Sequence, residues 1–123
     1  MHQLRISSIL AALVGLSSIA HAASPPVCKP ILAFTSARFS PMQPPTLERR
    51  WTALLSVDAS RCTTRSGAFT IGFARLKENA LDADFRLPFT WHSNAVDVSV
   101  DFWADEAVQR YWLDSIAPCP CRN

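Results

Sequence analysis

The chain has 123 residues, a formal net charge of +2, nine prolines, three glycines and four cysteines. A chain of this length holds one domain. The hydrophobic fraction is 49% and the charged fraction 18%, which excludes a disordered tail and predicts a packed core. So small a net charge gives no case for nucleic-acid binding.

Residues 1–22 have the composition of a secretory signal peptide. A basic residue, Arg5, precedes an apolar run from Ile9 to Ile19, and Ala20-His21-Ala22 fits the A-x-A cleavage pattern. The apolar run is shorter than the ~20 residues that cross a bilayer, which argues against a membrane anchor. We predict that residues 1–22 are removed and that residues 23–123 form a single domain. That domain is expected to be exported, periplasmic or secreted, and free of the membrane after cleavage.

Alternating apolar and polar residues predict four half-buried strands after the signal peptide, and residues 31–39 are a fifth, less regular candidate. The alternation is clear in 96–103, where Asp97, Ser99 and Asp101 separate three valines and Phe102. Prolines, Ser66-Gly67 and a polar stretch around residue 80 separate the segments, as turns do. The predicted strands cover residues 31–39, 50–59, 68–77, 85–91 and 96–103.

The last two of these strands are expected to pair as a hairpin. A loop at residues 92–95 lets Trp91 face Val96, and the same register places Arg86 opposite Asp101. Pro88 cannot donate a hydrogen bond to a ladder, so residues 85–91 are predicted to form a sheet edge or to be bulged.

Residues 104–117 fit two interpretations. Asp105 could cap a short helix whose apolar face includes Val108 and Trp112. Alternatively the segment is a last strand, in which Arg110 and Asp114 fall on the same face as those apolar residues. A chain of five or six short strands favours the strand interpretation.

The predicted fold is therefore all-β, a small antiparallel β-sandwich of about six strands. Its layout is similar to immunoglobulin and fibronectin-type sandwiches by analogy, and such a similarity of architecture implies no function. The chain lacks the immunoglobulin cysteine pattern, in which a disulfide joins the two sheets through the core.

The four cysteines predict disulfides, because an even number in a short exported chain is typical of them. Strand directions alternate in an antiparallel fold, so Cys28, Cys62, Cys119 and Cys121 should gather at one end of the sandwich. A bond between Cys119 and Cys121 would be strained, and each is expected to join Cys28 or Cys62. The sequence leaves the pairing open.

The near-neutral total conceals two oppositely charged segments. Residues 23–77 carry eight basic and two acidic side chains, a net charge of +6, and residues 78–114 carry the reverse, −6. Either the strands neutralise one another, or the molecule has a basic and an acidic face that could steer a charged partner. A tryptophan among acids could anchor a partner, and Tyr111 could join it, which makes a candidate interaction patch. The patch consists of Trp103, Asp105, Glu106 and Tyr111.

Signals of catalysis are weak. The one histidine of the predicted domain, His92, lies in a tight loop, and no nucleophile, phosphate-binding or metalloprotease motif occurs. Paired carboxylates such as Asp82 and Asp84 lack the remaining spacing of a calcium loop. The sequence predicts no catalytic residue, no cofactor, no metal site and no enzyme.

The favoured function is an exported accessory module that binds a protein or another extracytoplasmic macromolecule through the aromatic and acidic patch, without catalysis. One alternative is a periplasmic thiol-redox protein or other enzyme that uses Cys119 and Cys121, because strained disulfides are oxidising. The other alternative is a protein that binds a small ligand or a carbohydrate.

Overall fold

The structure is a computed structural model, and it describes residues 15, 26–41, 44–45, 47–78 and 80–123. The predicted signal peptide lies outside the described residues, apart from Gly15. The described part is all-β, with 69% of the residues in strands and no helix. This confirms the predicted fold class.

Six long strands and three strands of two residues follow one another along the described part of the chain. All pairs of strands are antiparallel. The strands are β1 (Val27–Cys28), β2 (Ile31–Phe39), β3 (Glu48–Asp58), β4 (Gly67–Lys77), β5 (Ala80–Leu81), β6 (Phe85–Trp91), β7 (Ala95–Trp103), β8 (Glu106–Ile116) and β9 (Cys119–Pro120).

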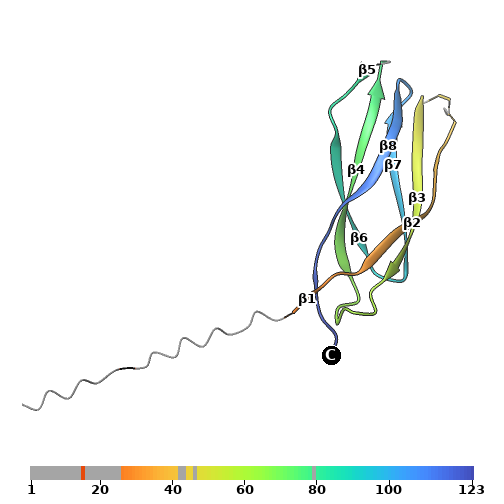
Figure 1. Cartoon of the computed structure of the whole chain (residues 1–123). Helices are drawn as coiled ribbons and strands as arrows, with labels where there is room; N and C mark the ends of the chain where they lie inside the picture. The colour runs from red at the N-terminus through yellow and green to blue at the C-terminus, as the bar shows by residue number, and fades with distance from the viewer. Residues whose placement is uncertain (1–14, 16–25, 42–43, 46, 79) are drawn as a thin grey trace, which may run out of the picture.

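Two sheets pack face to face into an elongated sandwich (Figure 1). One sheet has the order β2-β3-β7; in the other, β4 lies between β8 and β6, and β5 extends the pairing at the end of β4. The alternation predicted from the sequence turns one row of each strand inward. The buried core holds Trp51 and Leu55 of the first sheet and Ile71 and Phe73 of the second.

The predicted hairpin of β6 and β7 is wrong. The loop at residues 92–94 crosses from one sheet to the other, so that Trp91 pairs with Gly67 and Val96 pairs with Leu55. The apolar rows of the two strands meet across the core, where Phe85 and Phe102 lie 6.0 Å apart between ring centres, and form no ladder with each other. The alternation of apolar residues does not distinguish a β6–β7 hairpin from two strands in facing sheets, because both arrangements bury the same row of side chains.

The last long segment, β8, is a strand, which confirms the favoured interpretation of residues 104–117. Its pairing with β4 shifts twice, and the shifts leave Gln109 and Asp114 as extra residues in β8. Each such β-bulge reverses the alternation. As a result Val108 and Tyr111 both lie opposite inward residues of β4 although they are three positions apart. The bulges explain why the sequence also resembled a helix.

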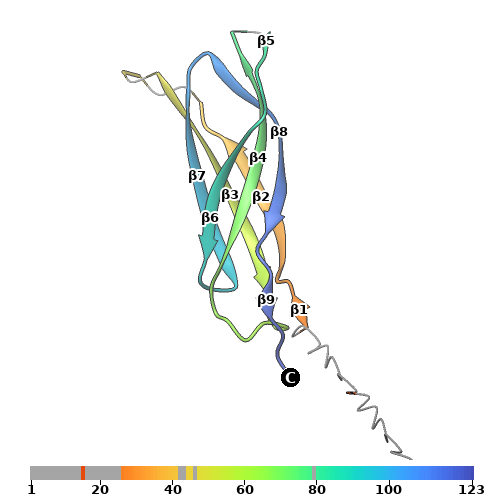
Figure 2. The same ribbon diagram turned by 90° about the vertical axis from the view of Figure 1, so that its left-hand side faces the viewer.

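All four cysteines lie at one end of the sandwich, as predicted, and we call this the cysteine end. Cys28 is bonded to Cys121 and Cys62 to Cys119, with Cα–Cα distances of 5.1 and 5.5 Å. The short ladder of β1 and β9 lies at the same end, near the C-terminus (Figure 2). The disulfides therefore fix the segments before the first long strand and after the last one to the sandwich.

The opposite end, which we call the distal end, contains the end of β2, the start of β3, the strand β5 and the turn at Ala104 and Asp105. Figure 1 shows β5 at this end, far from the C-terminus. The distal end also receives the last residues of β7 and the first of β8, and so it carries most of the predicted patch.

Candidate interaction surface

Trp103 is the last residue of β7 and lies on the outer face of the first sheet. It pairs with Glu48, and its side chain is 59% exposed. Neighbouring residues of β7 explain this position, because Phe102 points into the core and the next residue must point outward. An indole so exposed offers a large apolar surface and one hydrogen-bond donor to a partner.

Two further apolar side chains are exposed at the distal end. Leu47, which directly precedes the partner of Trp103 in β3, is 51% exposed, and Leu81 of β5 is 72% exposed. Asp105 is exposed in the turn after β7, and its carbonyl oxygen accepts a hydrogen bond from the backbone N–H of Glu78 at 3.2 Å. The distal end thus combines exposed apolar side chains with the exposed carboxylate of Asp105, which has no ion pair among the described residues.

Glu106, also part of the predicted patch, faces the interior and is only 4% exposed. Its carboxylate lies 3.5 Å from the guanidinium of Arg75, which also binds Asp82 at 2.8 Å. The guanidinium lies over the ring of Phe85, 4.9 Å from its centre. A charge buried in this way needs its ion pair, so Glu106 holds the end of the second sheet together and is not available to a partner.

Tyr111 lies on a different flank of the molecule, between β2 and β8. Its ring contacts Phe34 at 4.9 Å and Trp51 at 5.2 Å between ring centres, and it is 37% exposed. A shallow hollow of about 200 Å³ on this flank is bordered by Tyr111, Phe39 and Arg38. The structure therefore brings Trp103 and Asp105 together at the distal end and separates Tyr111 from them.

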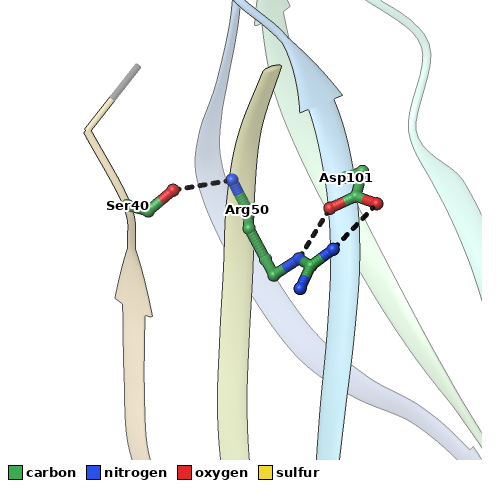
Figure 3. A network of polar contacts seen from close by, with 3 residues as sticks. All are labelled: Ser40, Arg50 and Asp101. Atoms are coloured by element: carbon green, nitrogen blue, oxygen red, sulfur yellow. Dashed lines mark hydrogen bonds and ion pairs between the residues drawn. The ribbon is translucent and has the colours of Figure 1, made fainter. Parts of the chain in front are cut away.

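A polar network crosses the outer face of the first sheet next to β7. The guanidinium of Arg50 donates hydrogen bonds to both carboxylate oxygens of Asp101, at 2.9 and 3.5 Å, and the Arg50 backbone N–H donates to Ser40 Oγ at 2.8 Å (Figure 3). The hydrogen bond from Arg50 lowers the pKa of the Asp101 carboxyl. The predicted pair of Arg86 with Asp101 is wrong, because β6 and β7 lie in different sheets; Arg86 binds Asp114 instead, at 2.9 Å.

The ion pairs partly neutralise the two charged segments of the sequence. Of the four ion pairs between described residues, three join residues 23–77 to residues 78–114, and the fourth lies within the second segment. Asp97, on the outer face of β7, is exposed and has no ion pair among the described residues. The cysteine end keeps four basic side chains without ion pairs in the described part of the chain: Lys29, Arg61, Arg65 and Arg122.

Sequence reasoning missed a cluster on the outer face of the second sheet. Trp112 lies across Gly72, where a β-carbon would collide with the indole ring. The indole N–H donates to Asp114 at 3.1 Å, and Arg110 stacks on the ring, 5.1 Å from its centre. Hydrogen bonds from the indole and from Arg86 lower the pKa of Asp114. The sequence contains one signal of this cluster, the glycine within the apolar run of β4. A glycine in a strand often marks a point where another group approaches the backbone closely.

The remaining features offer little chemistry in the described ranges. No group of three or more histidine, cysteine or acidic side chains is arranged to hold a metal ion there. A hollow of about 360 Å³ crosses the outer face of the first sheet and is lined by residues of β2, β3 and β7, none of them aromatic. Within the same ranges no helix could span a membrane.

Cys119 and Cys121, the candidate redox pair, belong to two different disulfides. Each is bonded to a cysteine far away in the sequence, and no cysteine is free. Cys62 and Cys119 are buried. Two disulfides in so small a domain are compatible with an oxidising environment outside the cytoplasm.

Comparison with known proteins gives no relative: no protein-family model, no curated protein and no solved structure matches this chain.

Proposed function

We propose that the protein is an exported interaction module that binds another extracytoplasmic macromolecule, a protein, through its distal end. The observation that carries the proposal is the exposure of Trp103 at the end of a rigid strand, with exposed leucines and Asp105 at the same end. Tryptophan is enriched among the residues that dominate binding energy at protein interfaces. The role involves no catalysis.

The contact surface is narrower than the patch predicted from the sequence. It is centred on Trp103 and Asp105, while Glu106 is tied to Arg75 and Tyr111 supports the core next to Trp51. The outward side chains of β7 extend this surface along the first sheet. Because much of the Trp103 side chain is exposed, its burial by a partner would contribute favourable free energy to binding.

The test is cross-linking and capture from the extracytoplasmic fraction of the source cells. Trp103→Ala should lower the yield of a captured partner about tenfold or more, as expected when a central interface residue is truncated. Ile31→Ala is the matched control, because Ile31 is an apolar residue of the first sheet that is about as exposed as Trp103 but lies at the start of β2, at the cysteine end. Equal capture by the wild type and Trp103→Ala contradicts the proposal, as does the absence of any partner.

Export itself is a second part of the proposal and rests on the signal-peptide pattern of residues 1–22 and on the two disulfides. The mass of the purified protein tests it. Cleavage after Ala22 removes residues 1–22, and intact disulfides leave no thiol for alkylation without a reductant. Two reactive thiols would instead favour the redox alternative.

A further inference from the structure

Four of the six long strands of the described sandwich pair on one side only. They are β2 and β7 at the edges of the first sheet and β6 and β8 at the edges of the second. A free edge presents a row of backbone N–H and C=O groups to any extended chain, and proteins usually protect such edges with prolines, bulges or charged side chains.

A proline or a bulge interrupts three of these edges. The pairing of β2 shifts between Phe34 and Ser36, that of β8 shifts twice, and β6 contains Pro88. In contrast, β7 pairs with β3 at every residue from Ala95 to Trp103 without a shift, and it contains no proline. It is therefore the one regular free edge in the part of the chain that the structure describes. Figure 2 shows β7 at the margin of the sandwich.

The core is incompletely covered on the same flank. The inward side chains Val96 and Val100 of β7 are only half-buried, and so are Phe85, Leu87 and Phe89 of β6. A strand added beside β7 would point every second side chain toward this row. Apolar residues at those positions would remove it from water.

The outer side chains of β7 indicate the charge of the added strand. Asp97 is exposed without an ion pair among the described residues, whereas Arg50 already holds Asp101. Two copies of β7 paired antiparallel about Ser99 would place Asp97 opposite the Asp101 of the second copy, and like charges in that position are destabilising. A basic residue of an added partner strand would instead face Asp97 with the opposite charge, and a second basic residue of that strand would lie over the ring of Trp103.

We propose that β7 accepts an extended segment of a partner protein as an additional antiparallel strand, with apolar residues facing the core and basic or hydroxyl residues on the outer face. This inference rests on the proposed binding function and gives it a mechanism. Backbone hydrogen bonds to alternate residues of β7 supply affinity, and the pattern of side chains supplies specificity. The antiparallel direction is the one used by every ladder of the fold.

A synthetic peptide tests the proposal directly on the disulfide-bonded protein. In the sequence Lys-Val-Thr-Val-Thr-Val-Lys-Val-Thr the two lysines fall opposite Trp103 and Asp97, and the valines face inward. Its counterpart has glutamates in place of the lysines. We expect the basic peptide to slow amide hydrogen exchange at alternate residues of β7 and the acidic one to bind at least about fivefold more weakly.

Variants separate strand addition from simple charge attraction. Asp97→Lys should weaken binding of the basic peptide about fivefold. Asp84→Lys makes the same charge change outside the strand and should alter the affinity less than twofold at physiological salt. Two N-methylated peptides, each blocked on one of its two edges, complete the test. Blocking the edge that faces β7 should abolish binding, and blocking the other edge should leave it intact.

The proposal is overturned if the basic peptide does not bind, if both methylated peptides behave alike, or if the wild-type protein protects β7 by self-association. It is also overturned if the protection appears on β2, β6 or β8. A partner captured through Trp103 without protection of β7 would leave the binding function in place and refute the added strand. Failure of the wild type to capture any partner refutes the binding function itself.

Discussion

At the scale of single residues, the outer face of the second sheet depends on one close approach. The indole of Trp112 occupies the place of a β-carbon at Gly72, and hydrogen bonding to Asp114 and stacking of Arg110 hold the ring there. The glycine is needed for its lack of a side chain, because the ring covers the backbone of β4 at that point.

Gly72→Ala should therefore lower the free energy of unfolding by about 1–3 kcal/mol, the usual cost of overpacking. The matched background is Trp112→Ala, where the colliding ring is gone and the added methyl group should cost less than about 0.5 kcal/mol. Urea unfolding of the wild type, both single variants and the double variant measures the coupling. Additive effects would show that the ring moves aside at no cost.

At the scale of the elements, the sequence predicted the strands well and their partners less well. Period-two alternation located the five long strands between residues 31 and 103, least regularly in residues 31–39, because each is half-buried, but it did not locate the two-residue β5. Alternation reports which row is buried but not which strand lies alongside, so β6 and β7 were wrongly paired. In β8 the bulges at Gln109 and Asp114 broke the alternation and left helix and strand hard to distinguish.

The positions of the candidate surface residues could likewise be predicted only where they depend on alternation and not on which strands pair. Trp103 follows a regular alternation, and its exposure could be inferred from the acidic residues of its row. The burial of Glu106 could not, because its ion pair with Arg75 joins residues distant in sequence and depends on the pairing of β4 with β8. The cluster around Trp112 depends on the same pairing.

Nuclear Overhauser effects between Hα protons test the arrangement of β6 and β7. The structure predicts such contacts between β3 and β7, where Leu54 pairs with Asp97 and Thr52 with Ser99. The hydrogen bond from the Val57 N–H to the Asn94 carbonyl oxygen fixes these as the non-hydrogen-bonded pairs of the ladder, in which Hα atoms lie close. It predicts none between Leu87 and Val100, which the hairpin would bring together. Contacts of the second kind would mean that β6 and β7 share a sheet.

At the scale of the whole molecule, stability depends on the cysteine end while the proposed binding occurs at and beside the distal end. The disulfides close loops with sequence separations of 93 and 57 residues. In the chain-entropy model, a disulfide that closes a loop of this length stabilises the folded state by about 4–5 kcal/mol. That is a large share of the roughly 5–15 kcal/mol of a typical domain.

Replacing Cys62 and Cys119 by alanine should accordingly lower the free energy of unfolding by about 4 kcal/mol, and replacing Cys28 and Cys121 should have an effect of similar size. Chemical denaturation of each double variant gives the value, with the oxidised wild type as reference. A loss below about 1 kcal/mol for both variants would show that the sandwich is stable without its disulfides.

The account as a whole is tested most directly by amide hydrogen exchange of the oxidised protein, alone and bound to a partner captured through Trp103. We expect binding to slow exchange in residues 95–105 and to leave residues 59–66 and 117–123 at the cysteine end unchanged. Protection confined to the cysteine end, or none along β7, would contradict the assignment of the binding surface.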